Sequence, residues 1–153
     1  MNPPQPGTGP RLSAETIHAS TVAIDGRAVL ITGPSGSGKS DLTLRLLDRG
    51  FTLVSDDQTI VRRDGDRLVA TAPPAIAGKL EVRGIGIVEV ERLGDVPVAL
   101  LVELTSDIQR LPDDSRERPI LGVGLPLISI DAMTASAPSK VSLALGRMGL
   151  RFQ

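Results

Sequence analysis

One stretch of the sequence determines the fold: Val29-Leu30-Ile31-Thr32-Gly33-Pro34-Ser35-Gly36-Ser37-Gly38-Lys39-Ser40. Its last eight residues match the pattern Gly-x-x-x-x-Gly-Lys-Ser/Thr, which binds phosphate when a strand precedes it and a helix follows. The four residues before it are apolar or β-branched, and leucines recur at helical spacing after it. The stretch therefore predicts a strand, a phosphate-binding loop and a helix that spans 40–47.

The chemistry of this loop is that of an anion cradle. Glycines allow backbone N–H groups to converge on phosphate oxygens, and the helix N-terminus adds partial positive charge. Lys39 would bridge the outer phosphates, and Ser40 would ligate Mg²⁺. The alternative is a glycine-rich turn that only caps a helix, and the strand and helix around the motif make that alternative weak.

A pair of carboxylates follows the next expected strand, in Leu53-Val54-Ser55-Asp56-Asp57. We expect that strand to lie parallel and next to the strand at 29–32, which would bring the pair close to Ser40. Adjacent aspartates repel each other, which suits one proton acceptor and one metal or hydrogen-bond partner. The residues alone do not assign the two roles, and a solvated Asp-Asp turn is the alternative.

Three further polar residues are candidates. Alternation along residues 79–90 predicts that Glu81 and Arg83 share one face of an extended segment. From the residues alone, a solvated surface explains such a face more often than a site does. His18 is the sole histidine, and a single histidine at the start of a strand is usually an ordinary surface or core residue.

The remaining pattern predicts an α/β fold with a mixed β-sheet and few helices. Asp25-Gly26 and Asp64-Gly65 predict two hairpins, of residues 17–24 with 27–32 and of 59–63 with 67–71. Further strands are expected at 86–90, 96–104 and 127–130, and a last helix at 140–148. We expect a flexible Pro/Gly-rich tail at 1–12, one catalytic domain at 13–150, and an exposed loop at 112–119.

Composition excludes several function classes. A net charge of −1 and an aromatic content of 1% argue against nucleic-acid binding. The absence of cysteine excludes disulfides, thiolate metal sites and a cysteine nucleophile. No apolar run approaches the roughly 18 residues of a membrane span, and the N-terminus lacks a secretory signal. We therefore expect a cytoplasmic protein without a membrane partner.

These motifs together resemble HPr kinase/phosphorylase, over its C-terminal catalytic domain and in its short proteobacterial form. The resemblance runs from about residue 13 to 150, and it rests on 17–20, 33–40, 49–57 and 80–87 in that order. The segment Glu81-Val82-Arg83-Gly84-Ile85-Gly86-Ile87 is the most specific of these, because unrelated nucleotide-binding families share the loop. The resemblance implies a fold similar to the nucleotide domain of phosphoenolpyruvate carboxykinase.

The activity that the resemblance implies is phosphorylation of a serine in the phosphocarrier HPr, with ATP and Mg²⁺, and a reverse reaction with phosphate. It implies that Glu81 joins Ser40 as a metal ligand and that the Asp56-Asp57 pair supplies the base, for which we favour Asp57. His18 and Arg83 match the family's active-site segments. The resemblance also suggests a homo-oligomer, commonly a hexamer.

Two later segments resemble the family in part. Asp107-Ile108-Gln109-Arg110-Leu111 makes Arg110 the candidate that stabilises charge on the transferred phosphoryl group. Pro138-Ser139-Lys140 resembles a Pro-Gly-Arg element that the family links to the reverse reaction, with the glycine and arginine replaced.

Two other functions remain open. A small-molecule kinase or nucleotide hydrolase could use the same loop, with Arg116 and Arg118 in a lid, but it would leave residues 81–87 unexplained. A nucleotide-binding regulatory module without catalysis would not need the retained carboxylates Asp56, Asp57 and Glu81.

Overall fold

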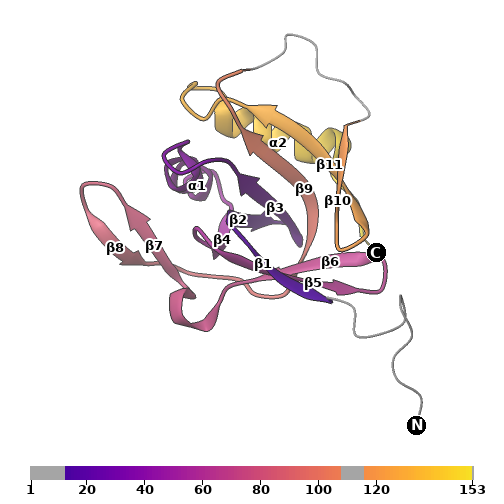
Figure 1. Ribbon diagram of the computed structural model, residues 1–153. Coiled ribbons are helices and arrows are strands. Elements are labelled where there is room, and N and C mark those ends of the chain that lie inside the picture. Colours follow the sequence, from indigo (N-terminus) through magenta and orange to yellow (C-terminus); the bar gives the residue numbers. More distant parts are fainter. Residues whose placement is uncertain (1–12, 108–115, 153) are drawn as a thin grey trace.

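A computed structural model describes residues 13–107 and 116–152 of the chain (Figure 1). Over these residues the chain forms strands and two α-helices around a curled sheet. The helices are α1 (Lys39–Leu47) and α2 (Ala137–Met148), with a short 3₁₀ turn at Pro74–Ile76. The strands are β1 (Ala14–Ile17), β2 (Ala19–Ile24), β3 (Arg27–Thr32), β4 (Thr52–Ser55), β5 (Thr59–Asp64), β6 (Arg67–Thr71), β7 (Lys79–Val82), β8 (Gly86–Glu89), β9 (Val96–Leu104), β10 (Glu117–Ile120) and β11 (Val123–Ile130).

The main sheet is mixed, as the sequence predicts. Its strand order is β1-β5-β6-β9-β3-β2-β4, and β11 also pairs with β9 and carries β10 at its side. Strands β3 and β11 both run parallel to β9, whereas the other pairs are antiparallel. The carboxyl ends of β3, β9 and β11 therefore meet at one edge, where ligands bind in open α/β sheets.

The centre of the sheet is buried on both faces. Residues Ala28, Val29, Leu30 and Ile31 of β3 are all fully buried. Val29 and Ile31 pack with the helices α1 and α2, and Ala28 and Leu30 pack with β5, β6 and β11. Successive strand residues point to opposite faces, which explains why this strand is an uninterrupted apolar run.

Both predicted hairpins are present, and the predicted helix 40–47 is α1. Helix α1 ends where the sequence places its cap, because Gly50 has a φ of 96° and Phe51 N–H donates to the carbonyl of Leu46. Helix α2 begins at Ala137, before the expected 140, with Pro138 in its first turn, where proline is tolerated.

Two of the sequence predictions differ from the structure, and others lie outside the described residues. Residues 79–90 form a separate hairpin of β7 and β8, which projects from the sheet in Figure 1. Within the expected loop 112–119, residues 117–119 belong to β10, which pairs with β11. The predicted tail at 1–12 and residues 112–115 lie outside the described residues.

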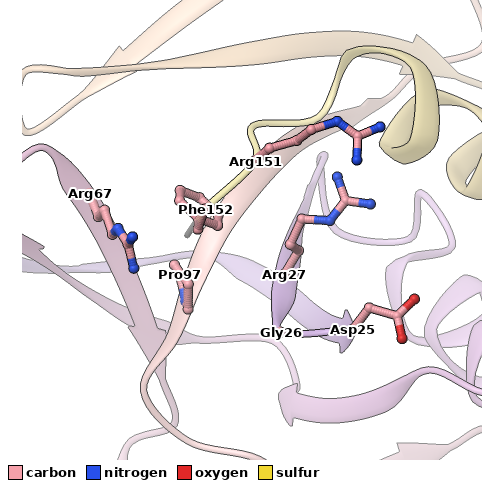
Figure 2. A pocket seen from close by; sticks show the side chains of 7 residues that line it. All are labelled: Asp25, Gly26, Arg27, Arg67, Pro97, Arg151 and Phe152. Atoms are coloured by element: carbon pink, nitrogen blue, oxygen red, sulfur yellow. The ribbon is translucent and has the colours of Figure 1, made fainter.

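A pocket of about 520 Å³ lies at the end of β3 that is remote from the phosphate-binding motif (Figure 2). Two arginines that line it hold the C-terminal end of α2: Arg27 donates to the carbonyl of Leu145, and Arg151 donates to that of Gly146. A third, Arg67, lies 4.9 Å from the ring centroid of Phe152. The hydrogen bonds from Arg27 and Arg151 stabilise the negative end of the α2 dipole, which explains why positively charged side chains line this pocket.

Neither helix in the described part of the chain has the length and apolar composition that crossing a lipid bilayer requires.

Candidate functional site

The phosphate-binding motif occupies the turn between β3 and α1. Its glycines are required by contact and by conformation. A Cβ at Gly33 would lie 2.6 Å from Oγ of Ser37 and 3.0 Å from Cβ of Leu104, and Gly38 has a φ of 99°. A loop that admits no side chain at these points keeps its backbone N–H groups accessible at the N-terminus of α1.

Lys39 lies beneath this loop and is buried, with 7% of its surface exposed. Its Nζ donates to the carbonyl of Gly33 at 2.7 Å and to that of Pro34 at 3.1 Å. An ammonium group held by two carbonyls of the loop is already placed beside the anion cradle. A bound phosphate would replace one or both of these carbonyl contacts.

Asp56 is the most highly connected acidic residue of the site. Its Oδ1 accepts hydrogen bonds from Oγ of Ser40 at 2.8 Å and from Oγ of Ser20 at 3.0 Å. Its Oδ2 accepts the backbone N–H of Glu81 at 3.1 Å. This single buried carboxylate therefore contacts α1, β2 and β7.

Asp56 lies close to Ser40 as expected, whereas Asp57 contacts His18 instead, and the expected pairing of the strand before them is wrong. Strand β4, which ends directly before Asp56, pairs with β2 and not with β3. Since β2 is antiparallel to both, β4 still runs in the same direction as β3. Asp56 reaches Ser40 across the end of β2, and this leaves room for Ser20 of β2 to join them.

Asp57 is exposed, unlike Asp56, and its carboxylate contacts a different residue. Its Oδ1 lies 2.7 Å from Nε2 of His18, which occupies the single residue between β1 and β2. The side chains of Asp57 and His18 are 63% and 50% exposed. Asp57 has a φ of 68°, and Gln58 N–H donates to the carbonyl of Asp56 at 2.7 Å, so the chain makes a tight γ-turn centred on Asp57. This turn separates the two carboxylates.

Glu81 and Arg83 do not share a face as expected. Glu81 lies on β7, whereas Arg83 lies in the turn to β8, so the alternation ends between them. Both are exposed. The backbone N–H of Glu81 is held by Asp56, which places this residue next to the carboxylate that contacts Ser40.

No group of three or more His, Asp or Glu side chains forms a ready-made metal site within residues 13–107 and 116–152. Mg²⁺ is commonly bound by one or two carboxylates together with the phosphates of a substrate. The set of the Ser40 hydroxyl, Asp56 and Glu81 has the hard oxygen donors that such a shared site needs.

A second pocket, of about 410 Å³, adjoins the phosphate-binding loop. Residues 34–37 form one side of it, and the ends of β9 and β11 form the other. Thr105, Ser106, Asp131 and Met133 are lining residues that the sequence analysis missed. The parallel pairing of β3, β9 and β11 places them there, and a single sequence gives no signal for that pairing. The volume lies within the usual range for small-ligand sites, about 300–1,000 Å³.

The two arginines considered for a lid are held on the sheet. Arg118 donates to Oε2 of Glu103 at 2.8 Å, and Arg116 lies 3.8 Å from Oε1 of Glu103 and donates to Ser129. The hydrogen bond from Arg118 is the main cause that lowers the pKa of Glu103 below its usual value. Arg110, the candidate for charge stabilisation, lies outside the described residues.

Fold and site together define a protein of mixed α/β type with a phosphate-binding loop between strand and helix, and with paired carboxylates at the end of a nearby strand. The family model named HPr Serine kinase C-terminal domain matches residues 11–143. This chain belongs to that family. The predicted resemblance and fold class are thereby confirmed.

Individual relatives agree with this membership. The HPr kinase/phosphorylase of Limosilactobacillus reuteri is 39% identical over 133 residues, which are 78% of this chain and 42% of the relative. That of Chlorobium limicola is 39% identical over 127 residues, covering 74% and 38%. This chain thus spans about two fifths of the length of these curated relatives.

The solved structure of the HPr(Ser) kinase/phosphatase from Coxiella burnetii is similar in three dimensions. It matches with a TM-score of 0.75 and 30% identity, over 86% of this chain and 94% of that chain. The match therefore covers nearly the whole length of both chains.

Proposed function

We propose that this chain is a protein-serine kinase that transfers the γ-phosphoryl group of ATP to a serine of HPr or a paralogous phosphocarrier. Family membership supports the substrate class, since the relatives are named for HPr. The observation that carries the proposal is the division of the two adjacent aspartates. Asp56 contacts the hydroxyl of Ser40, whereas Asp57 faces solvent beside His18.

The phosphate-binding loop would hold the phosphates of the nucleotide. Backbone N–H groups of 33–40 and the ammonium of Lys39 would bind the outer phosphates. The Ser40 hydroxyl, Asp56 and Glu81 would hold Mg²⁺, which neutralises charge on the phosphates when bound. The pocket lined by Thr105, Asp131 and Met133 would receive the remainder of the nucleotide.

Asp57 would act on the acceptor serine. Its Oδ1 contacts His18, and its Oδ2 has no hydrogen-bond partner within the described residues. An incoming serine would give its hydroxyl proton to this carboxylate while its oxygen bonds to the γ-phosphorus and the bond to the ADP oxygen breaks. His18 would orient Asp57, and Arg83 would lie at the edge of the acceptor site. Arg110 keeps its predicted role on the transferred group.

The same residues would serve a reverse reaction. Inorganic phosphate would attack phosphoserine, Asp57 would return the proton to the serine oxygen, and pyrophosphate would leave. Ser139 and Lys140, which replace the glycine and arginine of the family element, lie in the first turn of α2, where Ser139 accepts a hydrogen bond from Arg49. We further propose a cytoplasmic homo-oligomer, with a hexamer as the family precedent.

The rival small-molecule kinase or hydrolase finds less support. It would need a mobile lid with cationic side chains. Arg116 and Arg118 contact Glu103 at the sheet instead, and the β7–β8 hairpin would have no role.

One experiment separates phosphorylation of the phosphocarrier from ATP hydrolysis and from nucleotide binding without turnover. The protein is incubated with ³²P-labelled ATP, Mg²⁺ and HPr, and in parallel with HPr whose acceptor serine is alanine. Label on the wild-type phosphocarrier alone supports the proposal. Release of labelled phosphate without protein labelling would indicate a hydrolase, and nucleotide binding without turnover would indicate a regulatory module.

A further inference from the structure

Ser20 hydrogen-bonds to the side chain of Asp56 and to the backbone of Asp57. Each of these hydrogen bonds has only one possible direction. The Oγ of Ser20 is 3.0 Å from the backbone nitrogen of Asp57, which can only donate, so Oγ accepts there. Oγ is also 3.0 Å from Oδ1 of Asp56, so the single hydroxyl hydrogen goes to that carboxylate. Ser20 is fully buried, so water does not substitute for either bond.

The turn that Ser20 contacts is an unfavourable one. A γ-turn with positive φ at its central residue is rare and strained. Asp57 is that central residue, and Asp tolerates positive φ better than most residues but still at a cost. Such conformations persist only when the surrounding structure holds them, and they are frequent at functional sites. The bond from Asp57 N–H to Ser20, together with the bond from Ser55 Oγ to the carbonyl of Gln58, supplies that support.

We propose that Ser20 is a positioning residue that holds the Asp56–Asp57 peptide so that one carboxylate faces Ser40 and the other faces the acceptor. The proposal rests on the proposed function for the roles of the two aspartates. Ser20 is fully buried and acts on transfer through Asp57, because Asp56 keeps its hydrogen bonds from Ser40 and from Glu81 N–H when the bond from Ser20 is lost.

The test compares Ser20→Ala with a matched control on the same strand. Thr21 is also fully buried, but its hydroxyl contacts Thr59 and neither aspartate, so Thr21→Val is the control. Hydrogen-bond partners that orient metal ligands typically contribute about 10–100-fold, and we expect the same range for a residue that positions a carboxylate. We expect the single-turnover rate on HPr to fall by that factor in Ser20→Ala, with a near-normal Kd for ATP and near-normal rates in Thr21→Val. Ser20→Cys, a weaker donor and acceptor of similar size, should lie between.

A double-mutant cycle distinguishes positioning from a general loss of structure. In an Asp57→Asn background, Ser20→Ala should slow transfer by less than about threefold, because the group through which it acts is gone. The full effect of Ser20→Ala in that background would overturn the proposal, and so would a rate for Ser20→Ala equal to that of Thr21→Val.

A second measurement does not depend on the acceptor. The backbone amide of Asp57 should exchange with solvent about tenfold faster in Ser20→Ala than in the wild type or Thr21→Val, as measured by NMR. Unchanged exchange would overturn the proposed positioning. A wild type that binds Mg²⁺-ATP but labels no phosphocarrier would reject the kinase function, and the amide exchange would then still decide whether Ser20 holds the turn.

Discussion

The Oγ of Ser40 donates a 2.8 Å hydrogen bond to Oδ1 of Asp56, which joins the start of α1 to the end of β4. Because Ser40 is the hydroxyl that a phosphate-binding loop uses for Mg²⁺, the bond supports the proposed place of Asp56 on the metal side. In the same proposal the neighbouring Asp57 serves the acceptor side.

Replacement of the loop lysine should abolish transfer. In Lys39→Ala we expect a fall of about 10³–10⁵ in the single-turnover rate, the range for a cation that contacts the transferred phosphoryl group. Lys79→Ala is the matched control, because Lys79 is exposed on β7. Circular dichroism should be the same for both variants. Activity of Lys39→Ala within tenfold of wild type would contradict the role of the loop.

Neutralisation of Glu81 should affect metal use. An amide is a poorer ligand for a hard cation than a carboxylate, so Glu81→Gln should need more Mg²⁺ for half-maximal rate while its Kd for ATP changes less. Glu89→Gln, on the paired strand β8 of the same hairpin, is the control. A magnesium titration of both variants checks this, and coincident curves would show that Glu81 is only a surface residue.

Replacement of Asp56 and replacement of Asp57 should have different effects. Asp57→Asn removes the proton acceptor, so we expect the forward rate to fall about 10²–10⁴-fold with a near-normal Kd for ATP. Asp56→Asn places an amide among three hydrogen-bond donors, so it should weaken Mg²⁺-dependent ATP binding and lower stability by about 1–3 kcal/mol. Calorimetric binding and urea unfolding distinguish the variants. If Asp57→Asn proves mild and Asp56→Asn inactive with normal binding, the two roles are exchanged.

The Glu103 ion pairs should make stability depend on pH. Contact with Arg118, and then with Arg116, lowers the pKa of Glu103 in the folded state. A lowered folded-state pKa stabilises the fold above the unfolded-state pKa, and that contribution is lost as the pH falls through the folded-state value. Glu103→Gln should therefore unfold at a lower urea concentration than wild type at neutral pH. The difference between the two should shrink as the pH falls below the usual glutamate value of 4.5, and a constant difference would exclude the linkage.

Local sequence signals predicted much of the fold. The hairpin at Asp25-Gly26 and the helix end at Gly50 depend on neighbouring residues alone, and both are where the sequence places them. The position of β4 beside β2 could not be predicted, because either arrangement gives a buried apolar strand. The β7–β8 hairpin was missed because its turn residues at 83–85 lie within an otherwise regular alternation.

The candidate site was predictable in its chemistry but not in its contacts. The motif identifies Lys39 and Ser40 without a structure. The sequence left the roles of Asp56 and Asp57 open, because they depend on a γ-turn and on a serine from another strand. Ser20 stands two residues after His18, and no local pattern distinguishes its hydroxyl from that of Thr21.

The hydrogen bond from Glu81 N–H to Asp56 restricts how the β7–β8 hairpin can change in length during evolution. Leu80 is fully buried and Glu81 is exposed, so a slip of one residue in β7 would exchange these environments and move the donor away from Asp56. Insertions before Leu80 would shift the strand and the carboxylate together. Length variation is therefore tolerable only beyond Val82, where the chain turns, and the hairpin tip can vary in reach while its base stays fixed.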